Sequence, residues 1–291
     1  MILGTVPRQA LRNIETTVRL VRSVRQTKSL DYVRLHRSAR RIPRHTDGVF
    51  RFSFGRVAFN DVVSLEGQYI EIFIERGYEV ADLPASPRIL DCGGNIGLSV
   101  LWFKMRYPRS RITVFEPDPL IGRMLERNVR SFGLQTVDVV RAAVGAREGE
   151  AVFSPDHSWG GRIVPDLETE SGAASDTVRV PTIRLAEYVD ETIDLLKLDI
   201  EGSEYDVLLD LCASGKISLV RHIVCEMHGH YELQEEFATT WRALSDAGYH
   251  LAVRSGYPVT GSHGAGATPF PSVVSGRFHM LVYAWRPLAT V

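Results

Sequence analysis

The sequence has few cysteines and no long hydrophobic run. Its 291 residues include only Cys92, Cys212 and Cys225, which lie far apart. An odd, scattered set of this kind does not indicate a disulfide framework, so we expect buried thiols in a reducing, cytoplasmic compartment. No stretch of about 18 apolar residues is present, which argues against a membrane-spanning helix. The first ten residues also lack the apolar core of a secretory signal.

Charged residues nearly balance over the whole chain, with a formal net charge of -1, but they are unevenly distributed. Residues 1–48 contain eleven Lys or Arg and three acids, a net of +8, so the remaining residues carry -9. Apolar residues recur at helical spacing at Leu11, Ile14, Val18 and Val21. This pattern predicts an amphipathic basic helix. We therefore expect a basic helical extension over residues 1–48 and one folded domain over residues 49–291.

The basic extension has several interpretations. The favoured one is that its apolar stripe packs on the acidic body while the arginines remain in water. The alternatives are a peripheral contact with anionic membrane lipid, a nucleic-acid contact, or a homodimer contact.

Short apolar runs alternate with helical patterns from residue 88 onward. We expect seven strands, at residues 88–92, 111–116, 137–142, 193–199, 221–226, 250–254 and 278–285. Strands that alternate with helices predict an α/β fold, with a mostly parallel sheet covered by helices on both faces. A Gly-rich loop joins the last two strands, which favours an antiparallel pair. A long insertion, residues 144–190, holds two further strand-like pieces at 150–153 and 177–183.

The first predicted strand ends in Asp91-Cys92-Gly93-Gly94-Asn95-Ile96-Gly97. Ligands of parallel sheets bind at the carboxyl ends of strands, so this segment marks a binding site. The glycine spacing does not fit the G-x-G-x-x-G pattern of dinucleotide sites, which disfavours a nicotinamide dehydrogenase. An acid at the end of the strand opposes a diphosphate and suits a cationic ligand. Glu116 ends the next strand, where a carboxylate binds ribose hydroxyls. S-adenosylmethionine meets both conditions.

The chain resembles the FkbM-type family of S-adenosylmethionine-dependent methyltransferases. The resemblance covers residues 50–290 and rests on four segments: residues 89–97, Val114-Phe115-Glu116-Pro117-Asp118-Pro119, residues 141–145, and Leu196-Lys197-Leu198-Asp199-Ile200-Glu201-Gly202-Ser203-Glu204. It implies a class I, Rossmann-like methyltransferase fold. It also implies O-methylation of a small hydroxylated acceptor, such as a sugar or a secondary metabolite.

The resemblance further implies which residues bind the cofactor. Those at the methionine part are Asp91, Gly93, Asn95 and Gly97, with Asp199 beside them if the strand order follows that of the family. Glu116 is expected at the ribose. The expected border of the adenine consists of Pro117, Asp118 and Ala142.

The catalytic residues are expected after the fourth and fifth strands. A sugar hydroxyl is a poor nucleophile, so a base or a metal ion should lie near it. The favoured interpretation makes His228 a general base oriented by a carboxylate. The alternative is a Mg²⁺ or Mn²⁺ ion held by Asp199, Glu226 and His228. Glu204 and His230 are expected to cap or hydrogen-bond at helix starts, and Ser203 is expected to be a helix N-cap.

The acceptor site is the least defined part of the sequence. Tyr69, His157, Trp159 and Glu201 are the candidates, with His263 on a Gly-rich loop that could act as a lid. A nucleic-acid methyltransferase that uses the basic extension, or a membrane-surface binding module, are the alternative functions. Methylation of base amino groups typically uses an N/D-P-P-Y/F block after the fourth strand, which Asp199-Ile200-Glu201-Gly202 does not match. We therefore expect no nucleic-acid partner.

Overall fold

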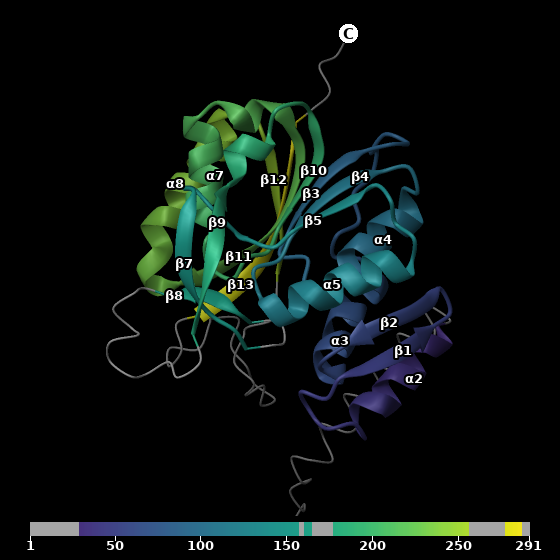
Figure 1. Cartoon of the computed structure of the whole chain (residues 1–291). Coiled ribbons are helices and arrows are strands. Elements are labelled where there is room, and N and C mark those ends of the chain that lie inside the picture. The colour runs from purple at the N-terminus through teal and green to yellow at the C-terminus, as the bar shows by residue number, and fades with distance from the viewer. Residues whose placement is uncertain (1–28, 157–159, 165–176, 256–276, 287–291) are drawn as a thin grey trace, which may run out of the picture. The chain divides into compact units, whose positions relative to one another are not determined.

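Two compact units make up the chain in the computed structural model, residues 1–77 and 78–291 (Figure 1). The structure describes residues 29–156, 160–164, 177–255 and 277–286. The division between the compact units falls after Gly77. The functional boundary predicted after residue 48 stays a prediction, because compactness does not show where a catalytic region begins.

The described part of the first unit contains helices and one hairpin. Its elements are α2 (Leu30–Ala39), β1 (Gly48–Phe52), β2 (Gly55–Phe59), α3 (Val62–Tyr69) and a π-helical turn (Ile70–Ile74). The residues around Phe50, which are not helical in period, form the antiparallel hairpin β1–β2. Helix α3 begins at Val62 because the Asp61 side chain caps it by accepting a hydrogen bond from the Val63 amide.

Helix α2 packs into this first unit although its residues show no clear periodic pattern. Its residues Tyr32 and Leu35 are buried. The carboxylate of Asp31 accepts a hydrogen bond of 2.6 Å from the Ser53 amide, and His36 contacts Glu66 at 2.6 Å. Part of the predicted basic extension is therefore an integral element of the first unit.

The second unit is built on a seven-stranded sheet. In chain order its strands are β3 (Arg88–Cys92), β4 (Arg111–Phe115), β5 (Val137–Val140), β10 (Ile193–Leu198), β11 (Val220–His230), β12 (His250–Ser255) and β13 (Arg277–Trp285). Their order across the sheet is β12-β13-β11-β10-β3-β4-β5. The five strands from β11 to β5 are parallel, and β13 runs antiparallel to both of its neighbours. The predicted fold class, seven strands and antiparallel final pair are confirmed.

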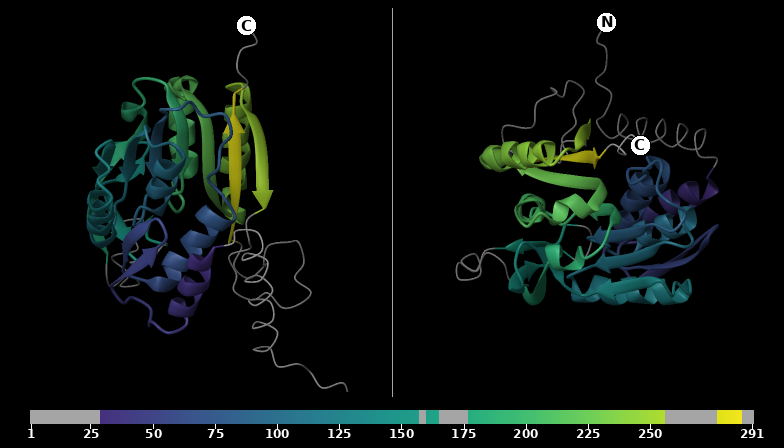
Figure 2. Two further views of the ribbon diagram at one scale, coloured as in Figure 1. Left: turned by 90° about the vertical axis from the view of Figure 1, so that its right-hand side faces the viewer. Right: turned by 90° about the horizontal axis from the view of Figure 1, so that it is seen from above.

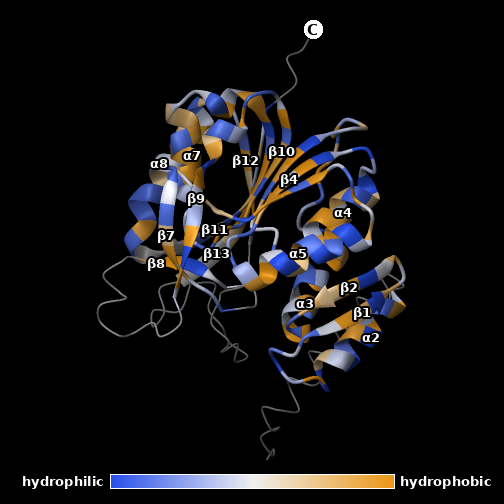
Figure 3. Cartoon of the chain, viewed as in Figure 1, coloured by the Kyte–Doolittle hydropathy of each residue, from blue (hydrophilic) through white to orange (hydrophobic). Residues whose placement is uncertain are grey.

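Helices cover both faces of this sheet (Figures 1 and 2). On one face lie α4 (Leu98–Arg106) and α5 (Pro119–Ser131), and on the other lie α7 (Glu204–Ala213) and α8 (Gln234–Asp246). Short 3-10 turns span Leu185–Tyr188, Lys216–Leu219 and Tyr231–Leu233. Every residue of β10 is buried, as expected for a central parallel strand, and the hydrophobic colouring of the strands in Figure 3 follows this core.

The insertion between the third and fourth strands of the sheet forms a separate, smaller sheet. Its strands are β6 (Ala143–Gly145), β7 (Gly149–Ser154), β8 (Arg162–Val164) and β9 (Val178–Arg184), in the order β6-β9-β7-β8. The two predicted strand-like pieces correspond to β7 and β9. The sequence does not predict β6 and β8, because three residues are too few to carry a periodic signal.

Among the described residues, none of the helices has the length and apolar character needed to cross a bilayer. The three cysteines carry free thiols, and Cys92 and Cys225 are buried. Burial raises the pKa of both thiols well above the usual range, so they are poor nucleophiles.

Candidate active site

Most of the predicted cofactor-binding and catalytic residues gather at the carboxyl ends of four neighbouring parallel strands, β4, β3, β10 and β11. Asp91 is in β3, Glu116 follows β4, Asp199 follows β10, and His228 lies in the last third of β11. Because these strands are adjacent and parallel, segments separated by more than 100 residues in the sequence meet at one edge of the sheet. This edge is where ligands bind in open α/β sheets.

The glycine segment between β3 and α4 is held against both neighbouring strands. The amides of Gly93 and Gly94 both donate to the Phe115 carbonyl, at 3.0 and 2.9 Å. The Asp199 amide donates to the Cys92 carbonyl at 3.1 Å. Gly93 has a φ of +82°, and a Cβ atom there would lie 1.8 Å from the Asp199 carbonyl oxygen. Only glycine fits at this junction, because the backbone that follows β10 packs directly against it. We call the turn from Gly93 to Gly97 the glycine cradle.

The rest of this segment turns sharply into α4. Asn95 has a left-handed φ of +46°, and Gly97, at +95°, is the N-cap residue of α4. The Asn128 side chain of α5 donates to the Ile96 carbonyl at 2.8 Å and fixes the turn from outside. Gly93, Asn95 and Gly97 therefore lie on one rigid turn, where they are predicted to contact the methionine part of the cofactor.

Asp91 lies deeper than the sequence suggested. Its side chain is fully buried, accepts a hydrogen bond of 2.6 Å from Ser99, and lies 3.5 Å from the Lys197 ammonium group. Burial raises the pKa of Asp91, while Lys197 and Ser99 act in the opposite direction. The Lys197 cation thus offsets the charge of Asp91. The argument that a free acid at the end of the strand attracts a cationic ligand therefore does not describe this geometry. Direct contact with the cofactor stays a prediction.

Glu116 organises the edge of the site between β4 and α5. One carboxylate oxygen accepts the Asn95 amide and the other accepts the Asp118 amide, both at 2.9 Å. Burial raises the pKa of Glu116 to about 7. A carboxylate has about four acceptor positions, so two remain for the hydroxyls of a ribose. The arrangement fits the predicted role of this residue.

The residues predicted at the adenine lie beside Glu116 and at the end of β5. Asp118 is buried and caps α5 by accepting hydrogen bonds from the amides of Leu120 and Ile121, at 2.8 and 3.2 Å. Pro117 is partly buried, and Ala142, two residues after β5, is buried. Asp118 therefore has a structural task of its own. Its contact with adenine, like those of Pro117 and Ala142, stays a prediction.

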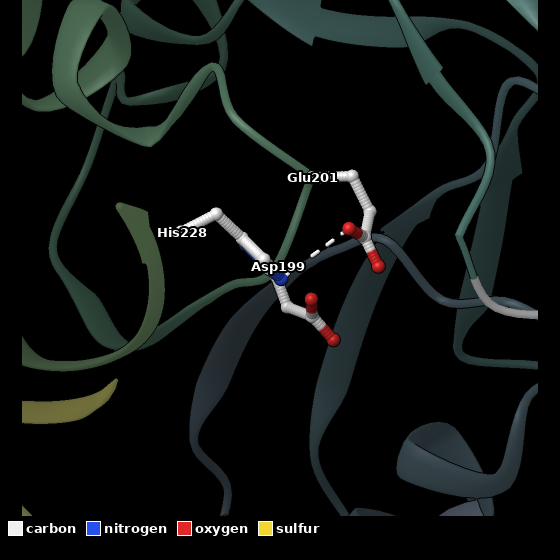
Figure 4. A group of neighbouring side chains, drawn as sticks. All are labelled: Asp199, Glu201 and His228. Atoms are coloured by element: carbon white, nitrogen blue, oxygen red, sulfur yellow. Dashed lines mark ion pairs between the residues drawn. The ribbon is translucent and has the colours of Figure 1, made fainter. Parts of the chain in front are cut away.

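His228 lies among carboxylates at the ends of β10 and β11 (Figure 4). Its Nδ1 is 3.0 Å from Glu204 Oε1, and its Nε2 is 3.3 Å from Glu201 Oε2 and 3.9 Å from Glu226 Oε1. Glu204 is fully buried and also accepts hydrogen bonds from the amides of Ile200 and Gly202, so both of its carboxylate oxygens act as acceptors. The prediction that Glu204 bonds at the start of α7 agrees with this geometry.

The protonation states of this cluster follow from the geometry. Burial alone would lower the pKa of His228, but the hydrogen bond and charge of Glu204, with the charge of Glu201, raise it to about 10. Burial raises the pKa of Glu201 to about 7, against the lowering influence of His228. With a hydrogen on each ring nitrogen, His228 cannot accept another proton at neutral pH. The prediction that it is the general base remains untested, and Glu201 is the better acceptor in this state.

Glu201 also adopts an uncommon backbone conformation, with a φ of +58°. Left-handed glutamate costs free energy, and such strain in a structure is typical of functional sites. Among the described residues, the group whose ligand atoms could hold a metal ion consists of Asp199, Glu201 and His228, with those atoms within 4.8 Å of one another. Glu226, which we predicted as a ligand, is not in this group. At 3.9 Å from His228 it instead adds negative charge beside the imidazole.

The predicted acceptor residues fall in different parts of the chain. Tyr69 ends α3 in the first unit, where its buried ring stacks on Phe52 and Phe73. Its hydroxyl is hydrogen-bonded to the Ser29 hydroxyl at 3.0 Å. His157, Trp159 and His263 lie outside the described residues, and the side chain of His230 is also not described. Glu201 lies in the cluster around His228, and the acceptor contacts stay predictions.

Two further residues of the site, Lys197 and Tyr78, are not predicted by the sequence. Lys197 is the second residue of the Leu-Lys-Leu-Asp segment, and its ammonium group lies 3.3 Å from Asp199 Oδ2. The hydroxyl of Tyr78 donates to the same oxygen at 3.2 Å. A lysine inside an otherwise apolar buried strand is the available signal for the first residue. Nothing in the sequence marks Tyr78, which is 121 residues from its partner.

A parallel sheet with a glycine turn after β3 and a carboxylate at the end of β4 has the arrangement of nucleotide-binding α/β folds. The family model of the methyltransferase FkbM domain matches residues 91–251, which is more than half of the chain. The chain therefore belongs to the FkbM methyltransferase family, and it is an S-adenosylmethionine-dependent methyltransferase.

Curated relatives carry methyltransferase names. Methyltransferase 1 of Beauveria bassiana is 29% identical over 216 residues, which cover 67% of this chain and 85% of the relative. The 31-O-demethyl-FK506 methyltransferase FkbM of Streptomyces tacrolimicus is 26% identical over 191 residues, which cover 55% of this chain and 73% of the relative. The 2-O-methyltransferase NoeI of Sinorhizobium fredii is 28% identical over 158 residues, which cover 46% of this chain and 60% of the relative.

A solved structure is also similar to the chain. The methyltransferase FkbM of Methylobacillus flagellatus is 16% identical with a TM-score of 0.48, and the match covers 75% of this chain and 48% of that one. This chain thus matches about half the length of that structure.

Proposed function

We propose that the protein is an O-methyltransferase that transfers a methyl group from S-adenosylmethionine to a hydroxyl group of a small acceptor, a sugar or a secondary metabolite. The observation that carries the proposal is the cluster of Asp199, Glu201 and His228 beside the glycine cradle. A proton acceptor next to the methyl donor suits a hydroxyl, which must lose its proton. Two relatives have names that specify O-methylation, which supports the same reaction.

The cofactor site has the features that this reaction needs. Gly93, Asn95 and Gly97 supply the cradle for the methionine part, and Glu116 supplies acceptors for the ribose. When bound, S-adenosylmethionine supplies an activated methyl group and leaves as S-adenosylhomocysteine. The protein then has to align the acceptor oxygen with the methyl carbon and remove one proton.

We assign the proton to Glu201. When the acceptor oxygen takes the methyl group, its hydroxyl proton would pass to the Glu201 carboxylate. His228, held as a cation by Glu204 and Glu201, positions that carboxylate and balances the charge of Asp199. A pKa of about 7 suits a base that works near neutral pH.

The first experiment is calorimetric titration with S-adenosylhomocysteine, with NAD as the control ligand. We expect micromolar binding of the first and none of the second. Acceptors are then screened by transfer of an isotopically labelled methyl group, with products analysed for methyl ethers. Label found only on nitrogen or carbon, or only on nucleic acid, would overturn the proposal.

The base is tested with Glu201→Gln. We expect kcat to fall by about 100-fold or more while affinity for S-adenosylhomocysteine stays near that of the unsubstituted protein. In the unsubstituted protein kcat should rise to a plateau as pH is raised through about 7, because only the ionised carboxylate accepts a proton. A Glu201→Gln protein with unchanged kcat would show that another group is the general base.

The same cluster supports a second proposal, a Mg²⁺ or Mn²⁺ ion that lowers the pKa of the acceptor hydroxyl. Asp199, Glu201 and His228 offer oxygen and nitrogen ligands within 4.8 Å of one another, and Glu204 could hold the imidazole through Nδ1. Dialysis against a chelator distinguishes the two. Loss of activity that Mg²⁺ or Mn²⁺ restores would favour the ion, and unchanged activity would exclude it.

A further inference from the structure

Lys197 is a charged residue in the most buried part of the molecule. It is the second-to-last residue of β10, in register with Asp91 of β3, and its side chain is 2% exposed. Removing an ammonium group from water is costly unless other groups replace the lost hydration. Neither the charge balance of the chain nor the helix and strand pattern accounts for a cation at this position.

The contacts of Lys197 join three parts of the cofactor site. Its Nζ donates to the Gly93 carbonyl at 2.6 Å and lies 3.3 Å from the Cys92 carbonyl. It lies 3.3 Å from Asp199 Oδ2 and 3.5 Å from Asp91 Oδ1. One ammonium group thus touches the end of β3, the first glycine of the cradle, and the carboxylate that follows β10.

Tyr78 completes the arrangement. Its ring centroid lies 5.2 Å from Lys197 Nζ, and its hydroxyl donates to Asp199 Oδ2 at 3.2 Å. Lys197 and Tyr78 therefore hold the same carboxylate oxygen from two sides. A carboxylate held in this way has lost its rotational freedom before any ligand arrives, so binding does not have to supply that ordering.

We propose that Lys197 is a positioning residue for S-adenosylmethionine. It holds the Gly93 carbonyl and the Asp199 carboxylate in place, and so sets the affinity for the cofactor without touching it. The inference rests on the dependence of the enzyme on S-adenosylmethionine and is independent of the acceptor. With both carboxylates ionised, Asp91, Lys197 and Asp199 together carry one negative charge. That negative charge suits S-adenosylmethionine, whose sulfonium group is positively charged.

The competing explanation is that Lys197 serves only to neutralise the buried Asp91. A pair of variants separates the two roles. Lys197→Met removes the ammonium group and leaves the Asp91 carboxylate buried without that cation beside it. The double variant Asp91→Asn with Lys197→Met also removes that buried charge, so most of the lost stability should return. If Lys197 positions the cradle, the affinity for cofactor should not return with it.

A second buried lysine provides the control. Lys104 in α4 is 8% exposed, and its Nζ donates to the Ser110 carbonyl and, at 2.5 Å, to Thr136 Oγ1. These partners flank the amino ends of β4 and β5, the ends opposite to the glycine cradle. Lys104→Met therefore removes a buried ammonium group of the same kind without altering the contacts of Gly93 or Asp199.

The experiment measures the Kd of S-adenosylhomocysteine by calorimetry for the full chain, at a temperature where circular dichroism shows each variant folded. We expect Kd to rise at least 10-fold in Lys197→Met and in the double variant, and to change less than twofold in Lys104→Met. With an identified acceptor, the KM for S-adenosylmethionine should rise more than kcat falls. If Lys197→Met does not fold, the double variant is compared with Asp91→Asn alone, so that loss of the predicted Asp91 contact is not counted as an effect of Lys197. A Kd equal in these two proteins would then overturn the proposal.

Two outcomes would overturn the proposal. One is a folded Lys197→Met protein that binds S-adenosylhomocysteine as tightly as the unsubstituted chain. The other is a double variant in which stability and affinity both return, because Lys197 would then act only through the charge of Asp91. Failure of all variants, and of the unsubstituted protein, to methylate any hydroxyl would bear on the O-methylation proposal and not on this one.

Discussion

At the scale of single residues, several site groups have protonation states that differ from those of the same side chains in water. Glu116 and Glu201 have pKa values raised to about 7 by burial, and His228 has a pKa raised to about 10 by its carboxylate partners. Carboxylates therefore titrate near neutral pH in this site, whereas the imidazole does not. This is the reverse of the order that free amino acids would suggest.

The raised pKa of Glu116 predicts pH-dependent cofactor binding. Only the ionised carboxylate can accept hydrogen bonds from both ribose hydroxyls, and the ionised fraction rises with pH through about 7. Affinity for S-adenosylhomocysteine, measured by calorimetry, should therefore increase by several-fold between about pH 6 and pH 8. In Glu116→Gln the affinity should be lower and nearly constant over this range. An equal slope in both proteins would show that another group is responsible.

At the scale of elements, helix starts and strand ends place the site residues. The α4 and α5 helices both begin at the site, and the second of them is capped by Asp118. The pair Asp118-Pro119 predicts this cap, because an acid before a proline at the first helical position is a strong start signal. The start of α7 differs, since Ser203 occupies the N-cap position without a side-chain capping bond.

This difference makes a matched pair of substitutions. Asp118→Ala should lower the free energy of unfolding by about 1 kcal/mol, because two amides of α5 lose their acceptor. Ser203→Ala should change it by only about a few tenths of a kcal/mol, since no capping bond is lost. Urea unfolding followed by circular dichroism gives both values. Equal losses would mean that the cap of Asp118 contributes little to stability.

At the scale of the whole molecule, the predicted basic extension overlaps the first compact unit. Residues 1–28 carry six of the eleven basic residues of the extension and one acid, but they lie outside the described structure. Helix α2 belongs to the first compact unit and has buried contacts there. A truncation designed at residue 48 would therefore remove packed residues of α2, whereas one that begins at Ser29 keeps them.

The membrane contact, one of the alternatives for the extension, can be tested with that truncation. If residues 1–28 bind lipid, the intact chain should co-sediment with phosphatidylserine vesicles at low salt, and less so as salt is raised, because ions screen basic residues near an anionic surface. The chain that begins at Ser29 should not co-sediment, and phosphatidylcholine vesicles serve as the control. Binding that persists in the shorter chain, or no binding of either chain, would exclude this role for residues 1–28.

The sequence alone determined the order and type of the main elements. Alternating apolar runs and helical patterns are local, so neighbouring residues are enough to predict the seven strands, the Asp118 cap and the glycine turn after Asp91. The same holds for the family, because Asp91 to Gly97 and Leu196 to Glu204 are contiguous segments. The short strands β6 and β8 and the helix α2 could not be predicted in this way, since their residues gain their places from packing against distant segments.

Only the tertiary structure decided which groups meet and in what electrical state. Strand order brings Lys197 to Asp91 and Gly93 across more than 100 residues, and it places His228 between Glu201 and Glu204. The pKa of a side chain depends on burial and on the charges within a few ångströms, which no sequence spacing reports. For that reason the sequence supplied His228 as a candidate base, whereas the folded site gives it a positive charge.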